Sequence, residues 1–435
     1  MSISAATLER IKTHAIAVLR ANDLRSATKP APELYPHQWN WDSAFIAIGL
    51  AHINPPRAQT EIRSLLSGQW KNGMIPHIIF NREVDSYYPG PEWWDIGQCE
   101  EAPDTILTSG ITQPPVLALA AHRIYIHSQD KAGALQFLDA IYDQLAESYR
   151  FFRTNRVVDD SGLVCIIHPW ESGLDNAPTW DSGMERIVVE PDSDVPRTDV
   201  TLIPAQERPT ELDYYRYTSL VSFFKRCKYS QVRILQECPF LVQPIMFNSL
   251  LNRDLEAMIE IGEILGRNND QITSWYEQMS SNFDDRFLDP ATGLYQDYDC
   301  RTGTAIDKDT FSRFIPILTG IPSSETLHCL VTTIISPETY WPVAGFPIPT
   351  VSMSSEDFDP VRYWRGPVWI NINWLVIQGL LRHGYMNPAL QLMEKTIQIV
   401  QKDGFFEYFH PVTGKGHGSD NFSWTASLII DLIIE

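Results

Sequence analysis

Positive charge is scarce in this chain of 435 residues, which has 34 Lys and Arg against 54 Asp and Glu and a formal net charge of -20. The basic residues are scattered and form no long block. Nucleic acids and anionic membrane surfaces bind clustered basic residues. The sequence therefore argues against a nucleic acid or a membrane as partner, and a small or neutral molecule fits better.

Long apolar runs are also missing, since none approaches the roughly 18 residues that span a bilayer. The N-terminal stretch MSISAATLERIKTHAIAVLRAN places Leu8, Ile11, Ala15 and Val18 at helical intervals among charged residues. A signal peptide instead has a charged segment followed by an apolar one. We expect a soluble, cytoplasmic protein.

Cysteine is sparse, and no two cysteines form a C-x-x-C pair. This spacing argues against a zinc site or a disulfide framework. The histidines lack H-E-x-x-H or H-x-H spacing, and no motif typical of serine hydrolases, dinucleotide sites or P-loops carries weight. We expect reduced cysteines, no metal ion and no cofactor.

Apolar residues make up 44% and charged residues 20% of the sequence, as in a globular protein with a large core. Apolar residues recur at helical intervals from end to end, for example at Ile272, Trp275, Met279 and Phe283. Strand-like alternation is rare. We predict helices at 3–21, 41–53, 57–69, 114–128, 132–155, 212–227, 243–266, 270–287, 308–319, 323–335, 365–383, 387–402 and 421–434.

Long loops rich in glycine, proline and aromatic residues separate the helical segments, and such loops commonly carry function. Similar turn sequences follow a helical segment at 159–163, 289–294 and 410–415, which predicts a repeated unit of helix and hairpin. We expect one all-α domain over residues 1–435, a barrel of paired helices with long loops and short β-hairpins on one face. A helical solenoid is the alternative, but we find no repeat period of about 34 or 40 residues.

Tryptophan is plentiful, with 13 in the chain, and it gathers in stretches that also carry polar side chains. Aromatic rings with a polar edge suit the C–H faces and hydroxyls of a sugar. Filling of a wide core explains any single Trp, but the polar companions in every stretch favour a ligand site. The stretches are YPHQWNWDSAF (35–45), YYPGPEWWD (87–95), HPWESGLDNAPTWD (168–181), RYWRGPVWININW (362–374) and FFEYFHP (405–411).

Carboxylic acids among these rings suggest cleavage of a glycosidic bond, which needs one acid to protonate the leaving oxygen and one carboxylate to activate water or attack the sugar. Apolar walls keep the acid protonated near neutral pH. Glu171, Asp175 and Asp181 all qualify from chemistry alone, and each could instead be a turn residue or a solvated charge. Glu407, between two aromatic rings, is the candidate partner, with an ion pair to a nearby Arg or Lys as the alternative.

Several motifs together resemble glycoside hydrolase family 63, and they follow the family's order from residue 35 to about 425: YPHQWNWDSAF, NGMIPH, HPWESGLDNAP, RYWRGPVWININW and FFEYFHPVTG. The resemblance implies an (α/α)6 barrel and hydrolysis of α-glycosidic bonds with inversion. It makes Asp175 the general acid and Glu407 the general base. In an inverting pair the two carboxyl groups lie roughly 6.5 to 9.5 Å apart, which leaves room for the attacking water.

The resemblance also implies the substrate contacts. On the side of the released sugar these are Tyr35, Trp39, Trp41, Asp42, Gln113, Trp170 and Trp369. On the leaving-group side they are Tyr87 or Tyr88, Arg208, Tyr214, Tyr363 and Trp364. Arg208 could bind a carboxylate with two hydrogen bonds, or form an ordinary salt bridge. The chain departs from glycerate-acting members of the family near Asn421, where we would expect a glutamine.

The sequence therefore predicts an inverting α-glycosidase that releases a hexose from a small solute such as glucosylglycerate or mannosylglycerate. Within the same chemistry, the alternative substrate is neutral, such as glucosylglycerol or an α-linked disaccharide, and an inward-pointing Arg208 or Arg365 would discriminate the two. A sugar epimerase would need two histidines facing the funnel. A sugar-binding protein would explain the tryptophans without catalysis. The sequence makes no prediction of the oligomeric state.

Overall fold

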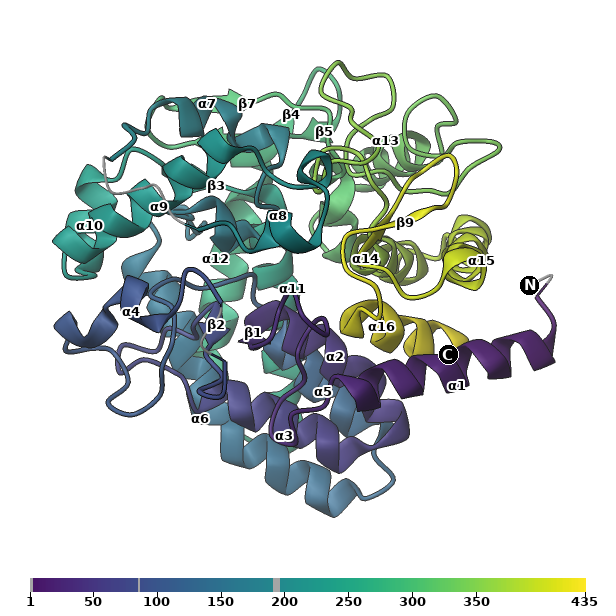
Figure 1. The fold of residues 1–435 in the computed structure, drawn as a ribbon, viewed down its shortest axis with the longest axis horizontal. Coiled ribbons are helices and arrows are strands. Elements are labelled where there is room, and N and C mark those ends of the chain that lie inside the picture. The colour runs from purple at the N-terminus through teal and green to yellow at the C-terminus, as the bar shows by residue number, and fades with distance from the viewer. Residues whose placement is uncertain (1–2, 85–86, 191–195) are drawn as a thin grey trace.

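The computed structural model describes residues 3–84, 87–190 and 196–435, and most of this chain is helical (Figure 1). The longer α-helices are α1 (Ala5–Ala21), α2 (Asn40–Ile53), α3 (Pro55–Leu66), α5 (Leu117–His127), α6 (Lys131–Asn155), α9 (Glu211–Arg226), α10 (Gln231–Glu237), α11 (Ile245–Leu265), α12 (Asp270–Phe287), α13 (Ser324–Ile334), α14 (Ile370–Arg382), α15 (Met386–Asp403) and α16 (Ser423–Ile434). Short helical turns are α4 (Pro91–Trp94), η1 (Ile96–Gln98), η2 (Pro169–Ser172), η3 (Pro178–Trp180), α7 (Asp181–Glu185), α8 (Asp199–Leu202), η5 (Ala205–Glu207) and η6 (Phe311–Leu318).

The strands are short and pair in antiparallel fashion. The pairs are β1 (Gln38–Trp39) with β2 (Ile78–Ile79), β4 (Leu288–Asp289) with β5 (Leu294–Tyr295), β8 (Tyr408–Phe409) with β9 (Gly416–His417), and β3 (Val242–Gln243) with β6 (Asp297–Asp299) and then β7 (Thr304–Ile306). The β4–β5 hairpin follows α12 and the β8–β9 hairpin follows α15, while a single bridge joins Val157 to Val164 after α6. The predicted unit of helix and hairpin is confirmed at these three places.

Helices α2 and α16 lie deep in the fold and pack against each other, although they come from opposite ends of the sequence (Figure 1). In α2, every residue from Asn40 to Ala51 is buried, and in α16 every residue from Ser423 to Leu432. A helix that is buried on all sides cannot show the one-sided apolar pattern of a surface helix. The outer α1 does show it, since Ile11, Ala15, Val18 and Leu19 face inward while the other side is exposed.

Some predicted helices differ from the observed ones. The segment predicted as a helix at 308–319 forms the 3-10 turns of η6, which contain Pro316. Proline has no N–H to donate and its ring disrupts an α-helix, so the α-helical pattern is not completed. Helix α14 begins at Ile370 and not at 365, because Pro367 precedes Val368, which pairs with Phe409 in an extended conformation. Helix α10 was not predicted.

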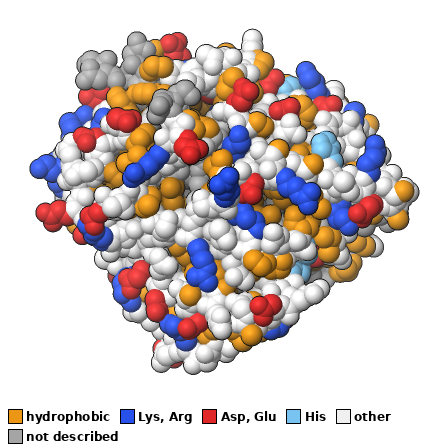
Figure 2. Space-filling model, turned by 60° about the horizontal axis from the view of Figure 1, so that its bottom comes forward, with side chains coloured by type: hydrophobic (Ala, Val, Ile, Leu, Met, Phe, Trp, Pro, Cys, Tyr) orange, Lys and Arg blue, Asp and Glu red, His pale blue; other side chains and the backbone are white. Residues whose placement is uncertain are grey.

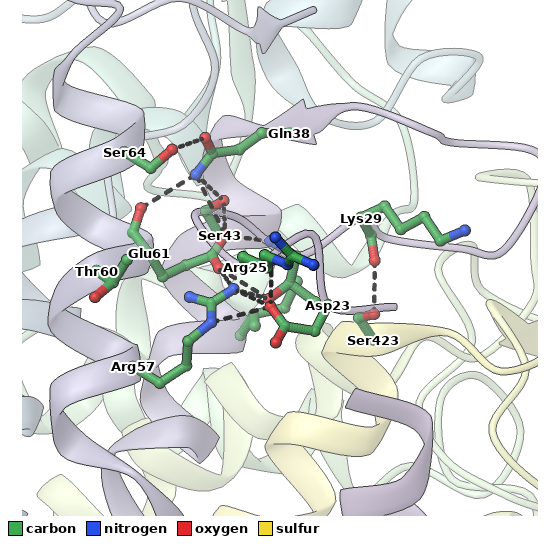
Figure 3. Close-up of polar contacts among 12 residues, drawn as sticks. Asp23, Arg25, Lys29, Gln38, Ser43, Arg57, Thr60, Glu61, Ser64 and Ser423 are labelled. Atoms are coloured by element: carbon green, nitrogen blue, oxygen red, sulfur yellow. Dashed lines mark hydrogen bonds and ion pairs between the residues drawn. The ribbon is translucent and has the colours of Figure 1, made fainter. Parts of the chain in front are cut away.

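A buried carboxylate holds the chain segment at the start of α2. Glu61 on α3 accepts a hydrogen bond from Ser43 Oγ at 2.6 Å and forms an ion pair with Arg57 at 2.9 Å (Figure 3). Gln38 Nε2 donates to the backbone carbonyl of Glu61 at 3.1 Å. Gln38 and Ser43 flank the segment from Trp39 to Asp42, so this network holds in place the residues that the sequence assigns to a sugar site.

The surface carries both signs of charge. On the face drawn in Figure 2, Lys and Arg side chains are interspersed with Asp and Glu, and no field of one sign covers it. All six cysteines are free, as expected. Within residues 3–84, 87–190 and 196–435, no helix combines the length and the apolar character needed to cross a bilayer.

Candidate active site

A pocket brings together side chains from the long loops and from the first turns of α2 and α16. All of the predicted site residues except Tyr88 line it: Tyr35, Trp39, Trp41, Asp42, Tyr87, Gln113, Trp170, Asp175, Arg208, Tyr214, Tyr363, Trp364, Trp369 and Glu407. Tyr88 packs against Trp93 instead. Segments more than 370 residues apart in the sequence, from Tyr35 to Glu407, therefore form one cavity.

The structure separates the three acids of HPWESGLDNAPTWD. Glu171 is buried, and both oxygens of its carboxylate have partners. Oε1 forms an ion pair with Arg156 at 2.8 Å, and Oε2 accepts the backbone N–H of Ile167 at 2.9 Å. Asp181 forms an ion pair with Arg365 and keeps 41% of its side chain exposed. Of the three, Asp175 alone lines the pocket.

Hydrogen bonds from large aromatic side chains hold the loop that carries Asp175. The hydroxyl of Tyr217 donates to the Asp175 carbonyl at 2.8 Å, and the Trp180 indole N–H donates to the Leu174 carbonyl at 2.7 Å. The turn at Gly173 has φ 72°, and a Cβ there would lie 2.5 Å from the Trp41 ring. Only glycine satisfies both the backbone angle and the close approach. The backbone of this loop is therefore fixed before any ligand arrives.

Burial makes the carboxyl group of Asp175 harder to ionise than an exposed one. Desolvation raises the pKa of its carboxyl group to about 7, the negative charge of Glu407 acts in the same direction, and the Arg208 guanidinium opposes them. Burial also raises the pKa of Asp42, with the charges of Glu407 and Asp175 adding to the effect. Carboxyl groups crowded in an apolar site cannot all ionise together, so a proton is held in this pocket.

Glu407 is buried just before β8, and donors surround its carboxylate. Tyr35 donates its hydroxyl to Oε1 at 2.8 Å, and Ser419 donates its backbone N–H to Oε2 at 3.1 Å. The pKa of Glu407 is raised on balance, because the effect of burial exceeds that of Arg208 and the two hydrogen bonds, which lower it. Donors that face a carboxylate favour its ionised form and here oppose the effect of burial.

Arg208 is the one Lys or Arg that lines the pocket among the described residues. Its guanidinium lies 4.2 Å from the centre of the Tyr363 ring. It forms ion pairs with Asp199, to which Nε donates at 3.2 Å, and with Glu407, whose Oε1 lies 3.7 Å from Nη1, so the ion pairs considered for Arg208 and Glu407 from the sequence are present. Nη1 is buried and has no hydrogen-bond partner among the described residues. A buried guanidinium N–H without an acceptor is unfavourable. An anionic group bound beside Glu407 would supply the acceptor.

The segment that carries Arg208 is attached to the hairpin that follows Glu407. Glu207 Oε1 lies 2.9 Å from His417 Nδ1, and Oε2 accepts the backbone N–H of Gly418 at 3.0 Å. The hydroxyl of Tyr408 donates to the Glu207 carbonyl at 2.7 Å. The candidate base and the candidate anion-binding residue are thereby held as one unit.

Stacked aromatic rings form the apolar walls. Trp364 and Trp369 lie 3.7 Å apart and nearly parallel, and Tyr408 stacks on Trp369 at 4.8 Å. The neighbouring residues Trp93 and Trp94 differ in placement, because Trp94 lines the pocket while Trp93 packs on Tyr88. The sequence does not distinguish these two tryptophans, because their placement depends on the path of the folded chain. The aromatic lining residues that were not assigned to the site from the sequence are His77, Trp94, Phe422 and Trp424, although each lies in a quoted motif or close to Asn421.

The pocket does not have the pair of histidines that an epimerase mechanism needs among the described residues. His77 is the one histidine that lines it among the described residues, and burial lowers its pKa to about 3, so it remains neutral. An epimerase that shuttles protons between two histidines is therefore disfavoured. In the part of the chain that the structure describes, the pocket holds no group of three or more His, Cys, Asp or Glu ligand atoms close enough to bind one metal ion.

A family model described as the mannosylglycerate hydrolase MGH1-like glycoside hydrolase domain matches residues 35–425. The chain belongs to glycoside hydrolase family 63. The resemblance noted in the sequence is confirmed, and with it the activity of a glycoside hydrolase.

Full-length relatives agree with the family assignment. This family 63 chain is 36% identical to the mannosylglycerate hydrolase of Rubrobacter radiotolerans and 35% identical to the glucosylglycerate hydrolase of Mycolicibacterium hassiacum, in each case over 98% of both chains. It also resembles the crystal structure of the family 63 mannosylglycerate hydrolase from Thermus thermophilus in complex with Tris and D-glycerate. That match has a TM-score of 0.91 and 35% identity, and it covers 97% of this chain and 99% of the other.

Proposed function

We propose that this glycoside hydrolase releases a hexose, with inversion, from an α-linked glycoside of glycerate such as mannosylglycerate or glucosylglycerate. The observation that carries the proposal is Arg208, a buried cation in the pocket whose Nη1 is ion-paired with Glu407 at 3.7 Å but makes no hydrogen bond among the described residues. The names of the relatives, which are mannosylglycerate and glucosylglycerate hydrolases, support glycerate as the acceptor of that N–H.

The two carboxyl groups would act on opposite sides of the scissile bond. Asp175 gives its proton to the glycosidic oxygen as the bond from that oxygen to the anomeric carbon breaks. Glu407 takes a proton from water, whose oxygen attacks the opposite face of the anomeric carbon. Asp175 ends as a carboxylate and Glu407 as a carboxylic acid, and solvent returns both to the starting state.

The remaining lining residues would divide between the two parts of the substrate. On the hexose side, Asp42 binds hydroxyls and Gln113 supports the wall, since its Oε1 accepts the backbone N–H of Trp41 at 3.3 Å. The other residues proposed for this side are Tyr35, Trp39, Trp41, Trp170 and Trp369. On the glycerate side we propose Tyr87, Arg208, Tyr214, Tyr363 and Trp364.

A neutral substrate such as glucosylglycerol or an α-linked disaccharide is the second candidate. It is favoured by the position near Asn421, which lacks the glutamine expected of glycerate-acting relatives. Arg365 gives no support to an anionic substrate, because it forms an ion pair with Asp181 and does not line the pocket. The charge preference therefore depends on Arg208.

We also propose that residues 1–435 form one domain with the architecture of an (α/α)6 barrel. The buried hydrophobic residues join into one continuous core that runs from Ile11 to Leu432. The first helices, α1 and α2, pack against the last, α16, as the closing of a ring of helices requires. The likeness to the family 63 crystal structure over nearly the full length supports the same arrangement.

Arg208→Gln tests the charge of the acceptor. We expect the KM for the glycerate glycoside to rise by about 10- to 100-fold, because a hydrogen bond to a charged group contributes about 1.5–3 kcal/mol. For the matched glycoside of glycerol, which has no carboxylate for Arg208 to bind, the KM should rise much less than for the glycerate glycoside. Initial rates of hexose release, measured with both substrates, give the comparison.

Arg365→Gln is the matched control, since it removes an arginine that lies near the site but pairs outside the pocket. Its KM values should follow those of the unmodified enzyme. A wild-type enzyme that cleaves the glycerol glycoside as well as the glycerate glycoside would overturn the proposal of an anionic acceptor, while the family and the carboxyl pair would stand.

The pH dependence of kcat/KM should report the proton of Asp175. A general acid must be protonated, so with a pKa raised to about 7 the activity should fall by about tenfold per pH unit above neutrality. Because the Arg208 guanidinium lowers the pKa of Asp175, Arg208→Gln should move this alkaline limb to higher pH. Rate profiles of both proteins between about pH 5 and 10 would show it, and an unmoved limb would mean that another group limits the rate.

A further inference from the structure

A second group of chemistry-bearing side chains lies at the far ends of three helices that begin near the pocket. It consists of His52 near the end of α2, His127 at the end of α5, and Asp431 and Glu435 at the end of α16. Helix α2 packs against both α5 and α16 (Figure 1). The group therefore joins three helices that are distant in the sequence.

The four side chains converge on one point. One ligand atom of each, a ring nitrogen or a carboxylate oxygen, lies within 4.8 Å of all the others. His52 Nε2 is 2.7 Å from Asp431 Oδ1, and His127 Nε2 is 3.7 Å from Glu435 Oε1. The backbone N–H of Glu435 donates to the Asp431 carbonyl, so both carboxylates lie on one face of the last helical turn.

We propose that His52, His127, Asp431 and Glu435 bind one divalent transition-metal ion, with zinc as the best match. Two imidazole nitrogens and two carboxylate oxygens form a four-ligand set of the kind that zinc accepts, with bond lengths of about 2.0 to 2.2 Å. Ligand atoms at such distances from one centre lie about 3 to 4 Å apart. To reach that spacing, the more exposed His127 and Glu435 must move closer, and the His52–Asp431 pair, now 2.7 Å apart, must open slightly as His52 Nε2 gives up its proton to bind the metal.

The surroundings orient the ligands as outer partners do in metal sites. Trp374 donates its indole N–H to Asp431 Oδ2 at 2.7 Å, which leaves Oδ1 directed at the cluster. Arg123 contacts Glu435 and also donates to Gln378 at 2.7 Å. Hydrogen bonds of this kind fix the orientation of carboxylate ligands. The two carboxylates supply the negative charge that a divalent ion requires. Glu435 Oε1, the oxygen nearest His127, also contacts Arg123, so Arg123 must share or release this oxygen when the ion binds.

One nitrogen of the cluster points independently to a ligand. His127 Nε2 is buried and has no hydrogen-bond partner among the described residues. The His127 and His52 rings lie 4.0 Å apart, which does not satisfy a ring nitrogen.

The site is structural and does not take part in hydrolysis. His52 lies ten residues beyond Asp42 on the same helix, which places it about 15 Å from the pocket at 1.5 Å per residue. An ion held by α2, α5 and α16 would fasten the ends of three helices whose other ends position substrate contacts. Pairwise motifs in the sequence do not indicate the site, because its ligands come from three separate segments.

Metal content and Co²⁺ spectroscopy of the full chain test the proposal. The protein is stripped with a chelator and titrated with Co²⁺, whose visible absorption reports four-coordinate binding, and then with Zn²⁺ as competitor. We expect one ion per chain and a Tm that rises with added Zn²⁺, because the ion binds the folded state. Values of kcat for the stripped and loaded enzyme should agree within about twofold, since the ion lies away from the pocket.

Two variants make the result specific. His127→Gln and Glu435→Gln should each weaken Co²⁺ binding by at least about tenfold, while His328→Gln, which changes an exposed histidine on α13, should leave it unchanged. Neither variant alters the bonds from His52 and Trp374 to Asp431, so both should fold. Absence of Co²⁺ binding, or binding equal in all variants, would overturn the proposal and leave His52, Asp431 and Trp374 as a hydrogen-bonded network without a metal.

Discussion

Asp175→Asn is expected to lower kcat for the glycerate glycoside by about 10² to 10⁴-fold, the usual contribution of a general acid. The amide has the shape of the protonated carboxyl group, so substrate binding should persist while proton donation is lost. Hexose release under saturating substrate measures the first effect, and isothermal titration calorimetry with uncleaved substrate measures the second. Unchanged hexose release would remove Asp175 from the mechanism.

The same substitution should make the protein more stable at neutral and alkaline pH. The pKa of Asp175 is about 7 in the folded protein and about 3.9 in an unfolded chain, so between these values the folded protein keeps a proton that the unfolded chain has lost. Stability therefore falls as the pH rises through this window. Asn has no proton to lose, and its Tm should exceed that of the wild type near pH 8, with the difference vanishing near pH 4. A variant that is inactive and less stable at pH 8 would point to lost folding.

A substrate whose leaving group departs without protonation distinguishes acid catalysis by Asp175 from other roles of this residue. An α-glycosyl fluoride has a small leaving group that departs without full protonation, so Asp175→Asn should lose much less activity on the fluoride than on the glycerate glycoside. Asp181→Asn is the matched control, because it changes an acid of the same loop that pairs with Arg365 outside the pocket. Its kcat should remain within about threefold of the wild-type value on both substrates, as for a surface ion pair.

The chemistry of the residues alone does not decide which of Glu171, Asp175 and Asp181 is the candidate acid. All three acids lie among indoles in one stretch, and the groups that distinguish them are Arg156 and Arg365. Arg156 lies 15 residues before Glu171 and Arg365 lies 184 residues after Asp181. Pairings of this kind arise only when the chain folds, so local composition predicts a tuned acid but not its position.

Helices were predicted well where periodic apolar residues meet a single core face. The segment 270–287 coincides with α12 (Asp270–Phe287), and 387–402 lies within one residue of α15 (Met386–Asp403) at each end. Helix α10 (Gln231–Glu237) was not predicted, because its seven residues span only about two turns. That length is too short to show a helical period of apolar residues. The predicted helix at 308–319 was wrong in type, because Pro316 interrupts it.

The family resemblance predicts individual residues of the candidate site, whereas the composition of the stretches predicts only where the site residues lie in the sequence. The aromatic and acidic stretches identify five places that meet in the pocket, and the family resemblance selects the residues within them. Tyr87 and Tyr88 could not be separated in this way, because they are equivalent in composition and the chain path alone places Tyr87 at the pocket. The strained backbone of Tyr363, with φ 41°, has no signal in the sequence.

Glu407→Gln should lower kcat by an amount similar to Asp175→Asn, about 10² to 10⁴-fold, because the amide cannot take a proton from water. Folding should persist. The amide oxygen can accept the N–H of Ser419, and the amide N–H can donate to the Tyr35 hydroxyl, which can act as donor or acceptor. Glu325→Gln, an exposed position in the first turn of α13, is the control for the substitution itself.

Azide distinguishes the base from the acid. It is an anion that attacks without losing a proton, so in Glu407→Gln it should restore turnover of the α-glycosyl fluoride and give the β-glycosyl azide, the product of a single inversion. In Asp175→Asn the base is intact and water is still activated, so azide should add little. An α-glycosyl azide from Glu407→Gln would contradict inversion, since net retention requires two displacements at the anomeric carbon. Rescue of both variants alike would contradict the division of roles, because a base and an acid on opposite sides of one bond cannot be replaced by the same nucleophile.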